Sequence, residues 1–81
     1  MALNDTDKQR IREQFAARVK ELRTATGQSQ DKFALEHGQH RTWVGHLERA
    51  ERVPTLYGLV DLARAFDITV AELVEGIDAD H

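Results

Sequence analysis

The sequence has 81 residues, 41% hydrophobic and 31% charged, with a formal net charge of −3 and no cysteine. This length and composition are typical of one small globular domain, so we expect residues 1–81 to form a single unit. The lack of cysteine excludes disulfides and thiolate zinc sites, and no apolar stretch has the length of a signal peptide core or a membrane span, which favours a cytoplasmic protein without membrane contact.

The first predicted helix begins near Asn4–Thr6 and ends near Thr26. Thr6 and Gln9 have the spacing of a capping box at its start, and Gly27 is a natural C-cap. Apolar residues recur at intervals of four, four and three, which predicts one buried helical face made by Ile11, Phe15, Val19 and Leu22.

The second predicted helix is short. Ser29 is a suitable N-cap, and Phe33 and Ala34 are the expected core residues. A tight turn over Gly38–His40 follows, because a right-angled helix corner needs a residue that tolerates positive φ.

The third predicted helix runs from about Arg41 to Arg49, with Val44 and Leu47 facing inward. It must end before Pro54, which disfavours helix in the residue ahead of it.

Two further helices complete an all-α prediction of five. Thr55 is the expected N-cap of the fourth helix, and Thr69 and Glu72 form a capping box for the fifth, which ends at Gly76. Their expected apolar residues are Leu59, Leu62, Ala63 and Phe66, then Val70, Leu73 and Val74.

Two short helices joined by a turn containing glycine have the outline of a helix-turn-helix, here residues 29–50. The run 19–74 resembles the lambda-repressor/Cro (XRE) family of helix-turn-helix regulators, with the spacing kept and no insertion. The third helix begins with Arg-Thr-aromatic-aliphatic, a pattern that is similar to the one in the controller proteins of restriction–modification systems. The matching residues are Val19, Leu22, Arg23, Gly27, Ser29, Gln30, Phe33, Ala34, Gly38, Arg41, Thr42, Trp43, Val44, Leu47, Glu48, Arg49, Pro54, Leu62, Ala63 and Leu73.

The resemblance implies a compact five-helix lambda-repressor-like fold and a sequence-specific transcriptional regulator of double-stranded DNA, a repressor or an activator. Arg41, Thr42 and His46 share one outward face of the third helix, which the family lays in the major groove. Arg41 suits a bidentate bond to guanine, worth about 1–3 kcal/mol of discrimination. Gly45 either lets the helix approach the groove floor closely or is a tolerated substitution without a role, and both interpretations stay open. A solvated polar face is the alternative interpretation.

Phosphate contacts are expected around this face, from Ser29, Gln30, His40, Trp43, Arg49 and Arg52. In the family, Gln30 contacts a phosphate and braces the start of the recognition helix, and Glu48 forms a structural salt bridge with Arg23. Trp43 lies over sugar and phosphate, or it covers the corner between the third and fourth helices; both interpretations stay open.

Four positions depart from the family pattern. Gly45 lies inside the third helix, where family members often have serine. Gln39 replaces an apolar residue that normally plugs the core, and His40 replaces the serine or threonine that normally caps the recognition helix. Ala50 replaces a common glycine, which predicts a third helix that runs slightly longer.

The last two helices carry more apolar residues than so small a core needs. We expect these residues to form the interface of a homodimer that binds a palindromic operator, or else to complete the core of the monomer. They are Leu56, Tyr57, Val60, Val70, Val74 and Ile77.

Residues 56–81 contain one arginine against six acidic residues, a net charge of −5 that ends in a short acidic tail at 77–81. This acidity suits a face turned away from DNA. The alternative is a protein-interaction module of the same fold, such as an antitoxin or modulator that binds a partner protein. No nucleophile triad, P-loop or complete set of zinc ligands is evident, so we expect no enzyme activity, metal or cofactor.

Overall fold

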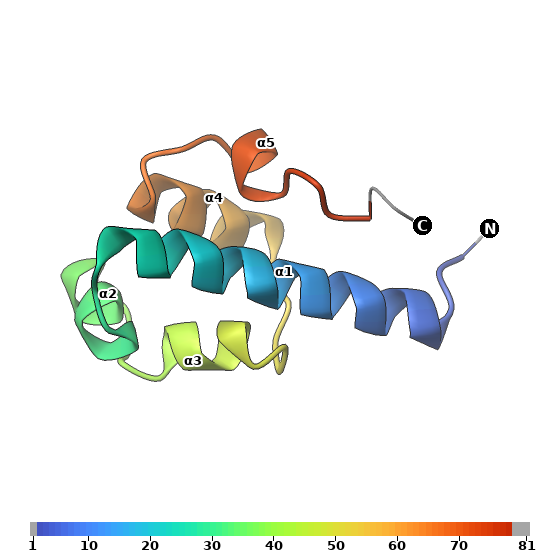
Figure 1. Cartoon of the computed structure of the whole chain (residues 1–81), viewed down its shortest axis with the longest axis horizontal. Helices are drawn as coiled ribbons and strands as arrows, with labels where there is room; N and C mark the ends of the chain where they lie inside the picture. Colours follow the sequence, from blue (N-terminus) through green and yellow to red (C-terminus); the bar gives the residue numbers. More distant parts are fainter. Residues whose placement is uncertain (1, 79–81) are drawn as a thin grey trace.

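The computed structural model describes residues 2–78, which form five α-helices and no strand. These are α1 (Asp5–Thr26), α2 (Gln30–Glu36), α3 (Trp43–Glu48), α4 (Leu56–Ala65) and α5 (Val70–Leu73) (Figure 1). The predicted all-α fold with five helices is confirmed. Of the expected acidic tail, residues 79–81 lie outside the described residues. No helix within residues 2–78 is long and apolar enough to cross a membrane.

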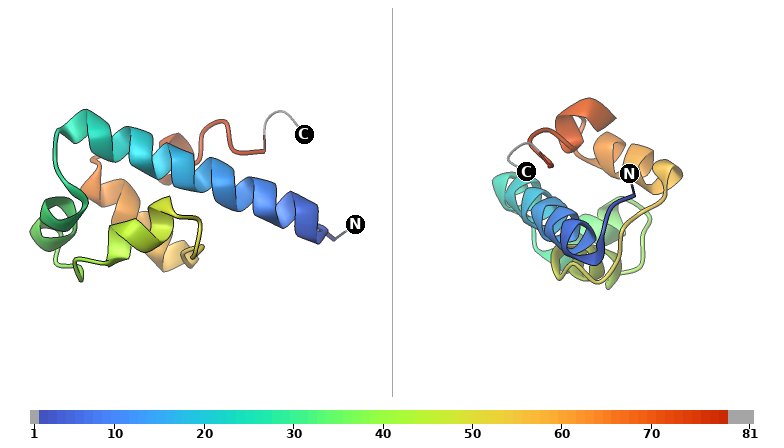
Figure 2. Two further views of the ribbon diagram at one scale, coloured as in Figure 1. Left: turned by 60° about the horizontal axis from the view of Figure 1, so that its bottom comes forward. Right: turned by 90° about the vertical axis from the view of Figure 1, so that its right-hand side faces the viewer.

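The molecule measures 39 × 22 × 22 Å, and the long helix α1 lies along one edge of it in both views of Figure 2. In the view of Figure 1, α2 and α3 lie below the C-terminal part of α1, and α4 and α5 lie above it. The first turns of α1 extend beyond the other helices (Figure 2). This arrangement leaves α3 at an outer edge of the molecule.

Side-chain caps set most helix starts. The Ser29, Thr55 and Thr69 side chains accept backbone N–H bonds at the starts of α2, α4 and α5, as predicted. The expected box of Thr6 and Gln9 is wrong, because Asn4 caps α1 and its Oδ1 accepts the Asp7 N–H at 2.8 Å. Asparagine is a stronger N-cap than threonine, so the helix begins earlier than the threonine would start it.

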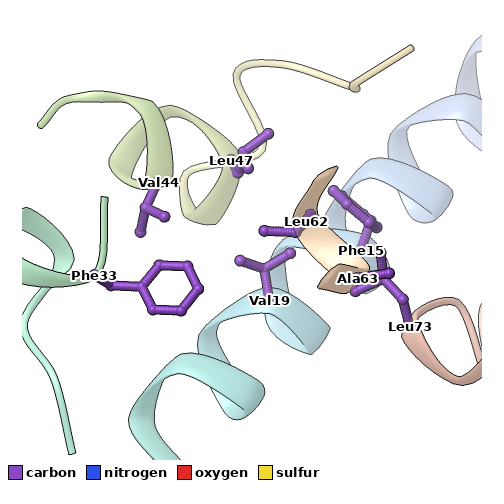
Figure 3. Packing of buried hydrophobic residues seen from close by; sticks show 8 residues of the cluster. All are labelled: Phe15, Val19, Phe33, Val44, Leu47, Leu62, Ala63 and Leu73. Carbon is purple, nitrogen blue, oxygen red and sulfur yellow. The ribbon is translucent and has the colours of Figure 1, made fainter. Parts of the chain in front are cut away.

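One apolar core joins all five helices. Its buried residues come from every helix, and Figure 3 shows the Phe33 ring pointing between α1 and α3. The predicted inward residues of α2 and α3 are buried, and full burial of such side chains contributes about 1.5–3 kcal/mol each. The core consists of Phe15, Val19, Phe33, Val44, Leu47, Leu62, Ala63 and Leu73.

Both short helices end in the same backbone motif. Gly38 after α2 and Ala50 after α3 adopt left-handed conformations, with φ of 72° and 60°. After α3, the Ala50 N–H bonds the Leu47 carbonyl at 3.2 Å and the Glu51 N–H bonds the His46 carbonyl at 3.0 Å, which is a Schellman motif. The prediction that Ala50 lengthens the third helix is therefore wrong, since Ala50 itself adopts the terminating conformation.

The third helix also begins later than predicted, at Trp43 instead of Arg41. Arg41 and Thr42 form a turn that the Trp43 N–H closes on the His40 carbonyl at 2.9 Å. The His40 ring accounts for this start, because its Nδ1 accepts the Thr42 N–H at 3.2 Å and so caps the turn ahead of the helix.

Candidate nucleic-acid interface

A buried ion pair holds α3 against the rest of the fold. Arg23, in the last turn of α1, bonds Glu48 at the end of α3 through Nε–Oε2 and Nη2–Oε1 distances of 2.5 and 3.0 Å. Only 11% of the Arg23 side chain and 3% of the Glu48 side chain are exposed. Arg23 Nη1 also donates to the Gln28 carbonyl at 2.8 Å, so the guanidinium ties the α1–α2 loop to α3. The salt bridge expected from the family resemblance is present.

The environment of the pair favours the charged forms of both Arg23 and Glu48. Burial raises the pKa of Glu48, but hydrogen bonds from Arg23 and Gln30 lower it by more, so the pKa lies below its ordinary value. The bond to Glu48 raises the pKa of Arg23 against the opposing effect of burial. A paired and hydrogen-bonded carboxylate behaves in this way.

Gln30 joins the same network from α2. Its Nε2 donates to Glu48 Oε1 at 3.0 Å. The side chain therefore braces the end of α3, because Glu48 offers a carboxylate oxygen to the amide. The Oε1 atom of Gln30 lies 3.3 Å from the place of a Cβ on Gly45, within the same helix, and the expected phosphate contact of Gln30 stays a prediction.

Gly45 is buried under two of the expected contact residues. A Cβ atom at this position would lie 2.9 Å from Arg49 Nη1 and 3.3 Å from Gln30 Oε1. The lack of a side chain thus makes room for the Arg49 guanidinium and the Gln30 amide. Gly45 is buried beneath these side chains in the structure, and its contact with a base stays a prediction.

The three predicted base-reading residues, which we call the reading face, are Arg41, Thr42 and His46. Arg41 and Thr42 are exposed in the turn before α3, and His46 is half-buried within the helix. Among residues 2–78, Arg41 makes no hydrogen bond or ion pair. The Thr42 hydroxyl lies 2.9 Å from His40 Nδ1. All three side chains are accessible, although only His46 lies inside the helix.

An open groove runs beside this face, between α3 and the start of α4. Thr42 and His46 of the reading face line it, together with His40 and Arg52, whereas Arg41 lies outside it. The groove thus gathers hydrogen-bonding and cationic groups from two separate segments of the chain. Arg52 is exposed and has no ion-pair partner among residues 2–78.

Glu51 also belongs to this surface, and the sequence interpretation missed it. Its Oε1 lies 2.8 Å from His46 Nδ1 and its Oε2 accepts the Arg49 Nε–H at 3.1 Å. The hydrogen bonds from Arg49 and His46 lower the pKa of Glu51. The signal in the sequence was the alanine at a common glycine position. A left-handed Ala50 brings the following residue back toward the last turn of α3.

The remaining predicted phosphate contacts differ in exposure. Ser29 and Arg49 are exposed, and the Ser29 hydroxyl accepts the Lys32 N–H. Trp43 is partly buried against the core, with its ring parallel to that of Phe33 at 6.5 Å between centroids. Of the two interpretations left open for Trp43, packing at the helix corner has the stronger support.

The predicted dimer residues divide into two groups. Leu56 and Tyr57, at the start of α4, are 69% and 84% exposed. Val70, Val74 and Ile77 are partly buried and pack against the core, and their place in a dimer interface stays a prediction. Val60 is half-buried. Val53, which the sequence interpretation did not single out, is 59% exposed just before α4.

No group of three or more histidine, aspartate or glutamate side chains within residues 2–78 is arranged to hold a metal ion.

Comparison with known proteins identifies the family of this chain. Residues 14–75 match the family described as "Helix-turn-helix domain". The chain is 39% identical over 64 residues to the control protein C.SmaI of Serratia marcescens, covering 79% of this chain and 76% of that protein. Among solved structures, the restriction–modification controller protein C.AhdI of Aeromonas hydrophila is 42% identical with a TM-score of 0.70, over 76% of this chain and 94% of that one. A hypothetical transcription factor NHTF from Neisseria is 27% identical with a TM-score of 0.72, over 90% and 82% of the two chains.

Proposed function

The chain belongs to the helix-turn-helix domain family, and from this premise we propose that it is a transcription regulator that binds double-stranded DNA sequence-specifically through α3 and the turn before it. Of the relatives named above, one is called a control protein, one a restriction–modification controller protein and one a hypothetical transcription factor, and these names support a role in gene control for this chain.

The main support for this proposal is the way in which α3 is held against the fold. The Arg23–Glu48 pair and Gln30 fix α3 against α1 and α2, while the reading face stays accessible at the outer edge of the molecule. A rigid recognition helix positions base contacts better than a mobile one, because the side chains are already placed before binding. The network therefore serves as the scaffold, and the outward residues carry the specificity.

The reading residues have complementary chemistry. Arg41 has a free guanidinium fork, which matches the O6 and N7 acceptors of guanine. Thr42 offers a hydroxyl, or a methyl group for contact with thymine. His46 offers a ring nitrogen whose role as donor or acceptor depends on its protonation.

Phosphate contacts come from the edges of the same surface. Arg49 and Arg52 are the cationic candidates, and His40 lines the groove beside them. Ser29 and Gln30 lie at the start of α2, where backbone N–H groups favour an anion. These contacts supply affinity and set the register of the protein on the duplex, without information about the base sequence.

We further propose a homodimer on a palindromic operator. A single short helix contacts too few base pairs to distinguish one site in a genome from the others. Two copies about 34 Å apart read two half-sites that are separated by one turn of the DNA. The exposed apolar side chains of Val53, Leu56 and Tyr57 adjoin one another in sequence at the start of α4, and they provide the apolar surface for a two-fold contact.

DNA binding is tested by titrating the protein into a labelled random duplex over a salt series, followed by selection of bound sequences from random DNA. We expect binding that weakens steeply with salt, with a slope of about −0.9 for each phosphate contacted. The selected sites should be inverted repeats with half-site centres about 10 base pairs apart. Absence of salt-sensitive binding at low ionic strength would contradict the proposal.

The dimer is tested by sedimentation at micromolar concentration. We expect the wild-type protein to sediment as a species of twice 9.2 kDa. Leu56→Asp should give the monomer, because it places a charge in an apolar contact. Leu35→Asp is the matched control, since Leu35 is a similarly exposed leucine (64%) on α2. A wild-type protein that sediments only as a monomer, or a dimer that Leu56→Asp leaves intact, contradicts this interface.

A further inference from the structure

The Glu51 carboxylate lies between two side chains of the proposed interface. Oε1 lies 2.8 Å from His46 Nδ1, and Oε2 accepts the Arg49 Nε–H at 3.1 Å. The Schellman motif positions the backbone as well, since the Glu51 N–H bonds the carbonyl of His46 itself. Glu51 is thus bonded to His46 twice, once through the two side chains and once through the two backbones.

The chemistry of this contact determines which nitrogen of His46 carries a proton. A carboxylate has only acceptor oxygens, so the ring nitrogen that faces it must be the one that bears hydrogen. In a neutral imidazole the other nitrogen is then an acceptor. With its proton on Nδ1, neutral His46 presents the Nε2 lone pair.

No other described group competes for the His46 ring. Thr42, His40 and Arg52 line the same groove, but the hydrogen bonds of the Thr42 and His40 side chains are made between these two residues. Within residues 2–78, Glu51 is the hydrogen-bond partner of the ring. The proton position in His46 therefore depends on Glu51.

We propose that Glu51 is a specificity-determining positioning residue that acts through His46. By accepting the Nδ1 hydrogen, it leaves Nε2 of the neutral ring to accept a hydrogen bond from a base. In the major groove, adenine and cytosine present an amino group, whereas guanine and thymine present carbonyl oxygens. His46 consequently selects adenine or cytosine at the position that it contacts. This inference rests on the proposed DNA-binding function.

Glu51→Gln is the discriminating variant. A carboxamide has both a donor and an acceptor, so it accommodates His46 with the proton on either nitrogen. The variant keeps the shape of the side chain but removes the constraint on the ring. It also releases Arg49 from a carboxylate, which leaves its affinity for phosphate undiminished or higher. Loss of base preference without loss of affinity is a result that general damage to the structure does not produce.

The first measurement uses the free protein and needs no DNA. A long-range ¹H–¹⁵N NMR spectrum of the histidine rings, taken at about pH 8 where an ordinary imidazole is neutral, shows which nitrogen carries the proton. We expect Nδ1–H for His46 in the wild-type protein and loss of that preference in Glu51→Gln. Glu75→Gln, the same charge change at an exposed position near α5, should leave the His46 signals unchanged. Nε2–H in the wild-type protein overturns the proposal.

The second measurement is selection from random duplexes at the same pH. The wild-type protein and Glu75→Gln should prefer adenine or cytosine over guanine or thymine at one position of each half-site, by roughly three- to tenfold for a single hydrogen bond. His46→Ala and Glu51→Gln should both lose that preference, and Glu51→Gln should retain at least wild-type affinity for random DNA. An unchanged preference in Glu51→Gln overturns this inference alone, whereas failure of every protein to bind duplex DNA overturns the proposed function with it.

Discussion

Arg23 and Glu48 form a two-point ion pair that joins the last turn of α1 to the last residue of α3. The two residues are 25 positions apart in the sequence, and both side chains are almost fully removed from solvent, at 11% and 3% exposure. The pair therefore controls how α3 is set against the long helix. Since Glu48 also accepts a bond from Gln30, removal of either charge affects three helices at once.

We predict that Arg23→Ala and Glu48→Ala each lower the free energy of unfolding by about 3–5 kcal/mol, because each leaves a buried charge without its partner. Urea unfolding at neutral pH measures this loss. Glu21→Ala, which removes an exposed carboxylate (71% exposed) from the same helix as Arg23, should change stability by less than about 0.5 kcal/mol. A loss below about 1 kcal/mol for both buried variants would show that the pair contributes little.

The same pair predicts an acid dependence of stability. Hydrogen bonds from Arg23 and Gln30 outweigh burial and keep the pKa of Glu48 below its ordinary value. A carboxyl group of this kind stabilises the fold fully above its unfolded pKa of about 4.3, and the contribution is lost as the pH falls through the lower folded pKa. The difference in unfolding free energy between wild type and Glu48→Gln should be constant at neutral pH and shrink below about pH 4.3. Urea unfolding from neutral to acid pH gives this difference, and one that does not vary with pH would contradict the assignment.

Local signals in the sequence predict the starts of α2, α4 and α5, whereas the Thr6 box is replaced by the Asn4 cap at α1 and α5 ends at Leu73 instead of Gly76. Ser29, Thr55 and Thr69 act within three residues of their own position, so their roles follow from spacing alone. The ends of α3 are different. No side chain caps its first turn, and the His40 ring instead accepts the Thr42 N–H in the turn ahead of it. Left-handed Ala50 ends the helix where the side chain disfavours that conformation.

The candidate site was predictable in its outline but not in its contacts. The family resemblance indicated the Arg23–Glu48 pair and the outward residues of the third helix. Gly45 looked open to DNA in the sequence, yet side chains from α2 and from the segment after α3 cover it. Glu51 reaches His46 only because the chain reverses at Ala50. Such contacts arise from the turn and from tertiary packing. The spacing of residues within one helix cannot predict them.

The left-handed conformation of Ala50, with φ of 60°, leads to a prediction about stability. Glycine adopts this conformation without the clash of a Cβ atom, which costs other residues about 1–2 kcal/mol. After the greater chain entropy of glycine in the unfolded state is subtracted, Ala50→Gly should stabilise the protein by about 0.5–1 kcal/mol. Thermal and urea unfolding measure the gain. Ala17→Gly is the control, since Ala17 is exposed within α1 and the same change there should destabilise by about 1 kcal/mol.

Arg41 and Arg52 are both exposed and unpaired among the residues described, but they should differ in what they contribute to DNA binding. Arg41 precedes α3 on the reading face, whereas Arg52 lines the groove near the start of α4. Arg41→Ala should weaken binding to the selected operator by about 1–3 kcal/mol for each half-site and relax the base preference at one position of each half-site.

Arg52→Ala should instead weaken binding to operator and to random DNA by a similar factor. It should reduce the salt slope by about 0.9 for each bound subunit, or about 1.8 for the proposed dimer, as expected for one lost phosphate contact per subunit. Binding titrations of both variants on operator and random duplexes, each over a salt series, separate the two effects. If Arg41→Ala lowers affinity equally for both duplexes, Arg41 contacts phosphate and base selection falls to Thr42 and His46. If Arg52→Ala lowers affinity for the operator alone, the groove beside α4 takes part in reading the bases.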